Sequence, residues 1–359
     1  MRVLQIIDSL SIGGAERVAI NYANALSENN GIKSYLCTTR EGGMLEEFIK
    51  PEVEVLHLNK KGIFDYRAYR RLIQYVKQHN ISILHAHSSS FFTAVVIKFF
   101  TKTKIVWHDH YGHSEKINER PVVALKVASR FFSYVISVNQ ILKTWANENL
   151  LIDESRVEYI PNYADLSFDN IIPSLPGEEG KRIIVLANLR PQKDHMNMLR
   201  AFKEVLDKGY KDWHLLFVGR DWEDEYSDGI KGYIKANDMN SNVSVLGGRS
   251  DTAQILKHSD IGVLSSESEG LPVALLEYAL ASLAVVCTDV GECAAVLDNG
   301  KVGKLVEPKN SEALYSALES YLCCTDSRQE SADKFYNFVN KNYSKDSVIK
   351  NVIERYSSL

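Results

Sequence analysis

The chain has 359 residues, 45% of them hydrophobic and 25% charged, and its formal net charge is −4. This is the composition of a soluble globular protein, and the length predicts two domains rather than one. The small net charge weighs against a nucleic-acid-binding protein, which would carry a strong basic stripe. The five cysteines are scattered without CxxC spacing, which weighs against a zinc cluster or a disulfide framework and indicates a reducing, cytoplasmic location.

The first half of the chain alternates strand and helix patterns, beginning with a strand at Arg2–Asp8, a glycine-containing loop and a helix at Arg17–Ser27. Alternation at this pitch predicts a parallel sheet with helices on both faces and ligands at the carboxyl ends of the strands. Neither a signal peptide nor an apolar run of about 18 residues is visible, so we expect a chain that does not span a membrane. Further strands are predicted at 34–38, 54–58, 83–86, 104–107, 134–138 and 157–160, with helices at about 65–79, 90–100, 121–132 and 140–149.

The pattern restarts after a linker at 166–180, which contains two prolines and has no clear periodicity. We therefore predict an α/β fold with one parallel-sheet domain at 1–165, a second at 181–335 and a cleft between them. The last segment, about 330–356, reads as helical and polar. Second-half strands are predicted at 182–189, 214–218, 243–246, 261–265, 283–288 and 303–306, with helices at about 194–208, 229–236, 252–257, from Pro272 onward and at 310–322.

Two glutamates bracket a predicted helix start in the second half. Glu269 lies in a loop ahead of the helix that Pro272 opens, and Glu277 lies inside the helix, with seven residues between the two. Proline suits the first helical position, and the free backbone N–H groups there bind anions and hydroxyls. Donors for phosphate beside acceptors for sugar hydroxyls indicate a nucleotide-sugar site. The alternative is a loop carboxylate that helps the helix dipole and a Glu277 on a solvated face.

Two loops supply candidate phosphate contacts. Gly13 and Gly14 follow the first strand, where a backbone without Cβ atoms can approach a phosphate closely. The GxGxxG pattern is absent, which weighs against an NAD enzyme. Arg190 and Lys193 follow the first strand of the second domain and could neutralise a diphosphate leaving group. The alternative is a solvated loop in which Asp194 caps the next helix.

Histidines follow two strands, as HAH at 85–87 and HDHYGH at 108–113. His85, His87, His108 and His110, with a carboxylate such as Asp109, could hold zinc or manganese, so a metal-dependent hydrolase is one alternative. It would leave the phosphate-facing features without a use, and we expect no metal. Otherwise His85 is a strand residue with a satisfied ring, and His87 and His110 line the cleft as partners of an acceptor hydroxyl.

Two stretches of the first half combine basic and aromatic residues, KKGIFDYRAYRR at 60–71 and KFFTKTK at 98–104. Such patches can rest on an anionic membrane surface, which would make the protein peripheral on the inner face of the membrane. The alternative is an ordinary amphipathic helix surface and the lead-in to a strand.

Seven motifs together resemble the retaining GT-B glycosyltransferases of the "group 1" or family-4 class. They are GGAERV at 13–18, IPNYAD at 160–165, LRPQKD at 189–194, LGGRSD at 246–251, SESEGLPVALLE at 266–277, TDVGE at 288–292 and VGKLVEP at 302–308. The resemblance covers nearly the whole chain in the right order. It implies two Rossmann-like domains, a sugar nucleotide held mainly by the second, an acceptor on the first, no metal, and a C-terminal helix at 336–359 that returns to the first domain.

The resemblance also assigns roles. It implies Glu269, His110 and Lys193 as catalytic residues, with Glu269 near the donor sugar, Glu277 on the ribose and Lys193 on the diphosphate. His87 and Glu16 are expected on the acceptor side. Many members carry arginine where this chain has Asn188, so Arg190 is expected to supply that cation. Many members also carry a glutamate near Ala295, so any role of that glutamate is lost in this chain. The donor-side set is Gly13, Gly14, Asn188, Arg190, Lys193, Gly219, Gly270, Leu271, Pro272 and Glu277.

We therefore predict transfer of a hexose from a UDP-linked donor to a glycan or lipid-linked glycan, with retention of configuration, in cell-surface polysaccharide synthesis. Two further alternatives stay open beside the hydrolase. A UDP-sugar 2-epimerase of the same fold would turn over the donor without an acceptor, and a silent binding subunit would bind UDP without consuming donor.

Overall fold

The computed structural model describes residues 1–112, 114–166, 168 and 172–359, and the chain divides into two compact units. The first unit consists of 1–163 with 345–359, and the second of 164–344. Part of the predicted linker, at 167 and 169–171, lies outside the described residues. The predicted boundary at 335/336 falls inside a helix, and the chain passes between the units after Ser344 instead.

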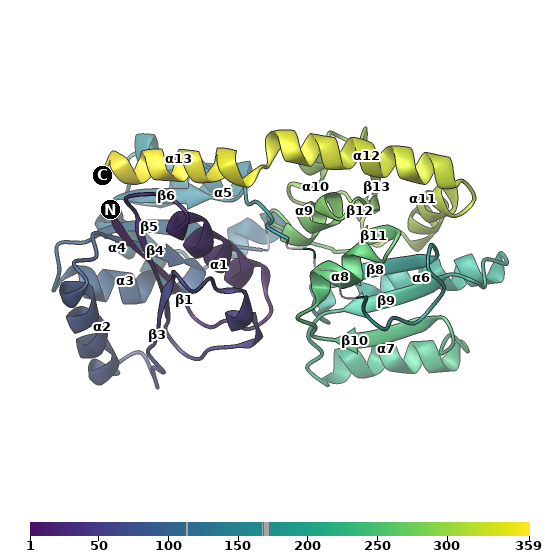
Figure 1. Cartoon of the computed structure of the whole chain (residues 1–359), viewed down its shortest axis with the longest axis horizontal. Helices are drawn as coiled ribbons and strands as arrows, with labels where there is room; N and C mark the ends of the chain where they lie inside the picture. The colour runs from purple at the N-terminus through teal and green to yellow at the C-terminus, as the bar shows by residue number, and fades with distance from the viewer. Residues whose placement is uncertain (113, 167, 169–171) are drawn as a thin grey trace. The chain divides into compact units, whose positions relative to one another are not determined.

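The first unit is built on a seven-stranded parallel sheet in the order β3-β2-β1-β4-β5-β6-β7 (Figure 1). Its strands are rich in buried apolar residues, as expected of a sheet covered on both faces. They are β1 (Arg2–Ile7), β2 (Lys33–Thr38), β3 (Glu54–His57), β4 (Ile83–His87), β5 (Lys104–Asp109), β6 (Tyr134–Ser137) and β7 (Val157–Tyr159).

Helices cover both faces of this sheet. One face packs against α2, α3, α4 and α5 through a large apolar cluster centred on residues such as Trp107. The other face packs against α1, and the C-terminal helix α13 lies beside α1. The helices are α1 (Gly14–Ser27), α2 (Tyr66–Gln78), α3 (Phe91–Lys98), α4 (Val123–Ala128), α5 (Gln140–Asn149) and α13 (Lys345–Ser357).

The second unit has a six-stranded parallel sheet in the order β10-β9-β8-β11-β12-β13. One apolar cluster packs α6, α7 and α11 on one face, and α9 and α12 lie with α8 and α10 on the other. The strands are β8 (Arg182–Leu186), β9 (His214–Val218), β10 (Val243–Gly247), β11 (Ile261–Leu264), β12 (Ala284–Thr288) and β13 (Lys304–Val306). The helices are α6 (His195–Asp207), α7 (Glu225–Ala236), α8 (Thr252–Lys257), α9 (Val273–Leu280), α10 (Cys293–Val296), α11 (Ser311–Leu322) and α12 (Thr325–Asn342).

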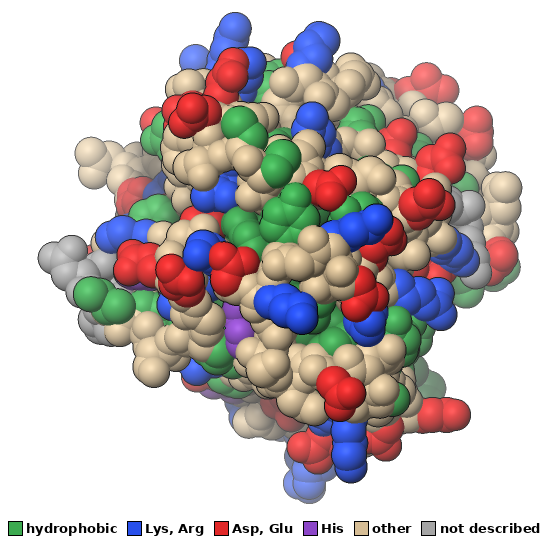
Figure 2. Space-filling model, turned by 90° about the vertical axis from the view of Figure 1, so that its right-hand side faces the viewer, with side chains coloured by type: hydrophobic (Ala, Val, Ile, Leu, Met, Phe, Trp, Pro, Cys, Tyr) green, Lys and Arg blue, Asp and Glu red, His purple; other side chains and the backbone are tan. Residues whose placement is uncertain are grey.

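Both sheets reverse their strand order at one point, between β1 and β4 in the first unit and between β8 and β11 in the second. This is the doubly wound, Rossmann-like arrangement, in which ligands bind beyond the carboxyl ends of the strands at the switch point. The predicted fold class is therefore confirmed. Figure 2 shows acidic and basic side chains interspersed on one face of the molecule, in keeping with a net charge of −4.

Tyr278 closes the gap that opens at the second switch point. Strands β8 and β11 pair only at Ile183 and Ile184 and then separate. The Tyr278 hydroxyl accepts a hydrogen bond from the backbone N–H of Leu186 at 2.7 Å and donates to the carbonyl of Val263 at 3.1 Å. A Cβ on Gly262 would lie 2.6 Å from the Tyr278 ring, so glycine there admits the ring.

Replacing Tyr278 by phenylalanine is expected to lower the free energy of unfolding by about 1–3 kcal/mol, because a buried N–H and a buried carbonyl lose their partner. Denaturant unfolding measures the change. Tyr321→Phe is the matched control, since that buried hydroxyl contacts the hydroxyl of Ser331 and not the backbone of a strand. An equal cost in both variants would contradict a bridging role for Tyr278.

Candidate functional site

A buried carboxylate and a cation meet at the carboxyl edge of the second sheet. Lys193 ends a short turn (Pro191–Lys193) after β8, and Glu269 lies in the loop between β11 and α9. The Lys193 Nζ donates to Oε1 of Glu269 at 2.6 Å, and Ser266 Oγ donates to the same oxygen at 2.6 Å. Glu269 is only 6% exposed. Such partners offset the cost of burying a carboxylate this deeply.

Hydroxyl groups and backbone bonds hold these two loops together. Ser265 Oγ donates to the carbonyl of Lys193 at 2.9 Å, and the N–H of Glu267 donates to the carbonyl of Gln192 at 2.8 Å. Thr288, at the end of β12, donates to the carbonyl of Ser266 at 2.7 Å. Sequence reasoning did not single out Ser265 or Thr288, although a small hydroxyl residue at the end of a buried strand is a recognisable signal.

Gly291 allows a third loop to pass beside Glu269. Its φ is +54°, and a Cβ there would lie 2.3 Å from the carbonyl oxygen of Glu269. The next residue, Glu292, donates its backbone N–H to the carbonyl of Gly270 at 3.0 Å. The glycine therefore fixes the backbone that carries the buried carboxylate.

Gly291→Ala is expected to lower the activity of this site by roughly tenfold or more, because the added Cβ must displace the Glu269 backbone by several tenths of an ångström. Gly300→Ala is the control. Gly300 also has positive φ, at +86°, but a Cβ there would lie no closer than 3.7 Å to any neighbour. Both variants should lose stability by about 1–3 kcal/mol from the left-handed backbone. Equal activity in the two variants would contradict the displacement.

Glu277 is the fifth residue of α9 and is 6% exposed. The alternative of a Glu277 on a solvated face is therefore wrong. The prediction that Pro272 occupies the first helical position is wrong. Pro272 is the N-cap residue, with extended ψ of 118°, and the helix begins at Val273. Leu271 is buried and Gly270 accepts the bond from Glu292, so this loop is tightly held.

The remaining donor-side candidates of the second unit lie in the loops that follow β8 and β9. Asn188 Oδ1 accepts the backbone N–H of Arg220 at 2.8 Å, which ties the loop after β8 to the loop after β9. The exposed Arg190 guanidinium lies 4.4 Å from the Trp222 ring centroid. A Cβ on Gly219 would lie 2.1 Å from the carbonyl oxygen of Ala187, so only glycine fits there. That Arg190 replaces the missing arginine stays a prediction.

Gly13, Gly14 and Glu16 lie at the start of α1 in the first unit. Gly13 is the N-cap residue, and a Cβ on it would lie 2.3 Å from Oε2 of Glu16. The Glu16 carboxylate thus lies across the positive end of the helix, where negative charge is favoured. Nothing lies within 4 Å of the corresponding Cβ position on Gly14. Their predicted roles toward donor and acceptor stay predictions.

The four histidines form one cluster on the face of the first sheet that α1 and α13 cover. His85 pairs through Nδ1 with the hydroxyl of Tyr356 in α13, and its Nε2 lies 3.1 Å from Nδ1 of His108. His87 Nε2 lies 2.8 Å from Oε1 of Gln5, and its Nδ1 lies 2.9 Å from Nε2 of His110. With Gln5 Oε1 as acceptor, the His87 proton is on Nε2 and His110 donates to Nδ1.

Burial keeps these rings neutral. It lowers the pKa of His85 and of His110 to about 3, and the pKa values of His87 and His108 fall well below the usual 6.5. His85, His87 and His108 are 0% exposed, whereas His110 is partly exposed at the end of β5. The prediction for His85 holds, since its ring is satisfied. The prediction that His87 contacts an acceptor is wrong, because helix and sheet enclose it.

A metal-dependent hydrolase is not favoured by this arrangement. Ligand atoms of His85, His87 and His108 lie within 4.8 Å of one another, as a metal site would require. A catalytic metal also needs an open coordination position for water or substrate, and these rings are enclosed. Asp109 is not available as a bridging carboxylate, because Arg120 binds both of its oxygens at 2.6 and 2.8 Å.

Comparisons with known proteins agree on one family. The family model described as "Glycosyl transferases group 1" matches residues 168–338, and "Glycosyltransferase Family 4" matches residues 12–168. The Escherichia coli protein named UDP-Gal:alpha-D-GlcNAc-diphosphoundecaprenol alpha-1,3-galactosyltransferase is 24% identical, over 92% of this chain and 88% of that protein. The Escherichia coli O-antigen biosynthesis glycosyltransferase WbnH is 22% identical, over 97% of this chain and 98% of that protein.

The fold has close counterparts among solved structures. The crystal structure of HepE from Anabaena in complex with UDP and glucose matches with a TM-score of 0.81 at 19% identity, covering 99% of each chain. Three observations agree on the family. The chain forms two doubly wound sheets, it pairs Lys193 with the buried Glu269 at the second switch point, and two family models together span nearly the whole chain. The chain belongs to the group 1, family 4 glycosyltransferases, and it is an enzyme with the GT-B fold.

Proposed function

We propose that this glycosyltransferase moves a hexose from a UDP-linked donor to a hydroxyl of a lipid-linked or free glycan acceptor, with retention of configuration, in polysaccharide synthesis. The observation that carries the proposal is the Lys193–Glu269 pair at the carboxyl edge of the second sheet. The names of the Escherichia coli relatives and the UDP complex of HepE support the donor and acceptor classes.

The chemistry assigns a task to each group. The bond between the sugar C1 and the diphosphate breaks, a bond from C1 to the acceptor oxygen forms on the same face, and the acceptor proton passes to an oxygen of the departing UDP. No protein nucleophile takes part. Lys193 neutralises the charge that grows on the diphosphate, and Glu269 accepts hydrogen bonds from the donor sugar. In the protein without donor, Lys193 donates to Glu269, and its ammonium group turns to the diphosphate when the donor binds.

The test has two stages. Thermal shifts measured with UDP, UDP-glucose, UDP-galactose and GDP-mannose should show the largest rise for one UDP-sugar, because binding to the native state stabilises it. The preferred donor is then incubated with and without diphosphoundecaprenol-linked N-acetylglucosamine, and the product anomer is read by NMR. An α-linked product that forms only with acceptor, and equally in excess EDTA, supports the proposal. Donor turnover without acceptor, or a β-linked product, would overturn it.

We also infer that the first unit rests on an anionic membrane surface. Phe64, just before α2, is 92% exposed, and Phe99 and Phe100, just after α3, are 65% and 58% exposed. Exposed basic residues such as Arg67 and Lys102 lie on the same segments. No helix among the described residues is long and apolar enough to span a bilayer. Exposed aromatic rings beside basic charges suit the boundary between headgroups and acyl chains.

Co-sedimentation with vesicles tests this inference. The protein should sediment with vesicles that contain phosphatidylglycerol and remain in solution with pure phosphatidylcholine. A Phe64→Ser, Phe99→Ser double variant should lose most of the bound fraction, whereas Tyr336→Ser, a change at an exposed aromatic of α12, should not. Equal binding to both vesicle types, or loss in the control variant, would contradict the assignment.

A further inference from the structure

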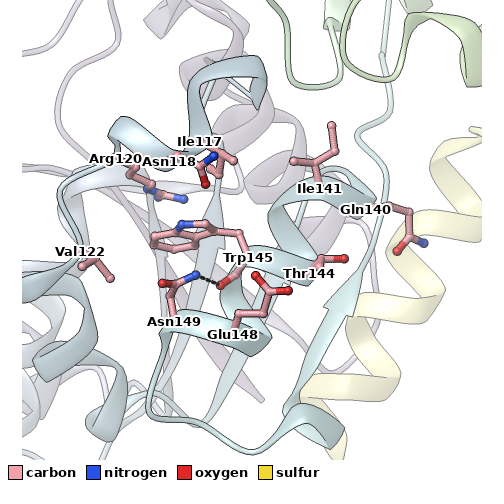
Figure 3. A pocket seen from close by; sticks show the side chains of 10 residues that line it. All are labelled: Ile117, Asn118, Arg120, Val122, Gln140, Ile141, Thr144, Trp145, Glu148 and Asn149. Atoms are coloured by element: carbon pink, nitrogen blue, oxygen red, sulfur yellow. Dashed lines mark hydrogen bonds between the residues drawn. The ribbon is translucent and has the colours of Figure 1, made fainter.

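A pocket of about 450 Å³ opens in the first unit between the segment at 117–122 and helix α5. Its floor is Arg120 and Trp145, both largely buried, and the residues of its rim are more exposed. Figure 3 shows the Arg120 side chain above the Trp145 indole, with Gln140 and Ile141 on the far side. The walls combine Ile117, Asn118, Val122, Thr144, Glu148 and Asn149.

The floor is rigid. The Arg120 guanidinium lies 4.3 Å from the ring of Trp145 and 4.5 Å from that of Tyr111, and it makes a bidentate salt bridge with the buried Asp109. Such a pair holds the guanidinium in one plane and orientation. Within the described residues Asp109 is the acceptor of both hydrogen bonds that Arg120 donates. The guanidinium therefore keeps further N–H groups for a ligand oxygen.

The charges select against an anion. Asp109 cancels the charge of Arg120 at close range, and Glu148 adds a negative charge at the rim. The pocket is therefore a poor site for a phosphate, although it contains an arginine.

The uncharged lining suits a polyhydroxylated ring. The amide of Asn118 and the hydroxyl of Thr144 can each donate and accept hydrogen bonds. The Asn149 amide nitrogen donates to the carbonyl of Trp145 at 3.0 Å, which leaves its oxygen as an acceptor. Aliphatic side chains such as Ile117 and Ile141 face the C–H groups that a sugar ring also presents. A volume of about 450 Å³ is at the small end of ligand pockets, as a mono- or disaccharide unit requires.

We propose that this pocket binds an uncharged sugar residue of the acceptor glycan. Its position supports this, because one end of the pocket, at Gln140, lies where α5 begins after β6, at the carboxyl edge where ligands of such sheets bind. From there the pocket extends along α5 to Asn149. The proposal rests on the proposed transfer to a glycan, and it adds the subsite and the neutral character of the residue that occupies it. A diphosphate group of the acceptor is bound elsewhere.

Saturation-transfer NMR on the full chain tests the pocket without catalysis. The probes are methyl α-glucoside, methyl α-galactoside, N-acetylglucosamine and N-acetylgalactosamine, each with saturating UDP so that the donor site is filled. At least one probe should give a signal that inorganic phosphate does not displace. Thr144→Phe, which fills the pocket from the exposed face of α5, should remove most of that signal. Glu154→Gln, at an exposed acid of the same unit outside the pocket, should leave it unchanged.

The outcomes separate this proposal from the proposed function. If no probe binds, if phosphate displaces the probe, or if Thr144→Phe retains the full signal, the pocket proposal is overturned. UDP binding by the wild-type protein is measured in the same samples, and its absence would count against the proposed function instead. With a working acceptor, Gln140→Ala and Asn118→Ala should raise the acceptor KM at least several-fold with little change in kcat. A change confined to kcat would contradict a binding role.

Discussion

Glu269→Gln is expected to lower the rate of sugar transfer by roughly 100- to 1,000-fold while the protein stays folded. Glutamine keeps the shape of the side chain and can still accept hydrogen bonds from Lys193 and Ser266, so the loop is retained. What is lost is the negative charge that the donor sugar and Lys193 both face. Initial rates with the preferred donor, beside a thermal unfolding curve, measure the two effects separately.

The neighbouring residue Glu267 supplies the control. It is an exposed acid of the same loop and forms a surface ion pair with Lys309 at 2.9 Å. Glu267→Gln should keep activity near the wild-type level, because surface pairs contribute about 0–1 kcal/mol. Lys193→Ala should also abolish most transfer, at a greater cost in stability, since it leaves the buried Glu269 without its cation. Wild-type rates in Glu269→Gln or Lys193→Ala would contradict the assigned roles.

The alternation of strands and helices was sufficient to predict both sheets, because most of the buried parallel strands are rich in apolar residues and most of the connections contain an α-helix. Element ends depended on side-chain contacts that a pattern does not show. Helix α7 begins at Glu225, four residues before the predicted start, because Asp224 caps it by accepting the N–H of Ser227 at 3.0 Å. The predicted single C-terminal helix is two helices, α12 and α13, with the break at Tyr343 and Ser344.

The sequence was sufficient to predict which loops form the candidate site, but not which side chains meet there. The carboxyl ends of β8 and β11 must lie together at a switch point, so Lys193 and Glu269 were expected on the same edge. The packing of a third loop determines the details. It decides that the two side chains meet at 2.6 Å and that Gly291 fixes the backbone of Glu269. A sequence in which Gly291 simply ends a short TDVG turn contains no sign of that contact.

The histidines show the same limit. The HxH spacing places His85 and His87 on one face of β4, which period-two alternation predicts. Which face that is, and what covers it, depends on Tyr356, 271 residues further along the chain. The pocket floor was missed for a similar reason, because Asp109 was considered as a metal ligand, whereas its partner Arg120 lies in an irregular segment without periodicity.

The buried histidines should make the protein unusually sensitive to acid. The folded-state pKa values of His85 and His110 are about 3, below the value of about 6.5 expected in the unfolded chain. Between these pH values the unfolded state binds more protons, so stability is full above about pH 6.5 and falls as the pH drops toward 3. Each ring contributes a slope of about 1.4 kcal/mol per pH unit, and His87 and His108 act in the same direction.

Urea unfolding at several pH values between 5 and 7.5 measures this slope. His110→Gln removes one of the titrating rings at the partly exposed end of the cluster, so its stability should depend on pH less steeply by about 1.4 kcal/mol per unit below pH 6.5. His258→Gln, outside the cluster, should leave the slope as it is in the wild type. Because the readout is the slope and not the stability at one pH, a general loss of packing in His110→Gln does not imitate the effect. An unchanged slope would contradict a lowered pKa of His110 in the folded protein.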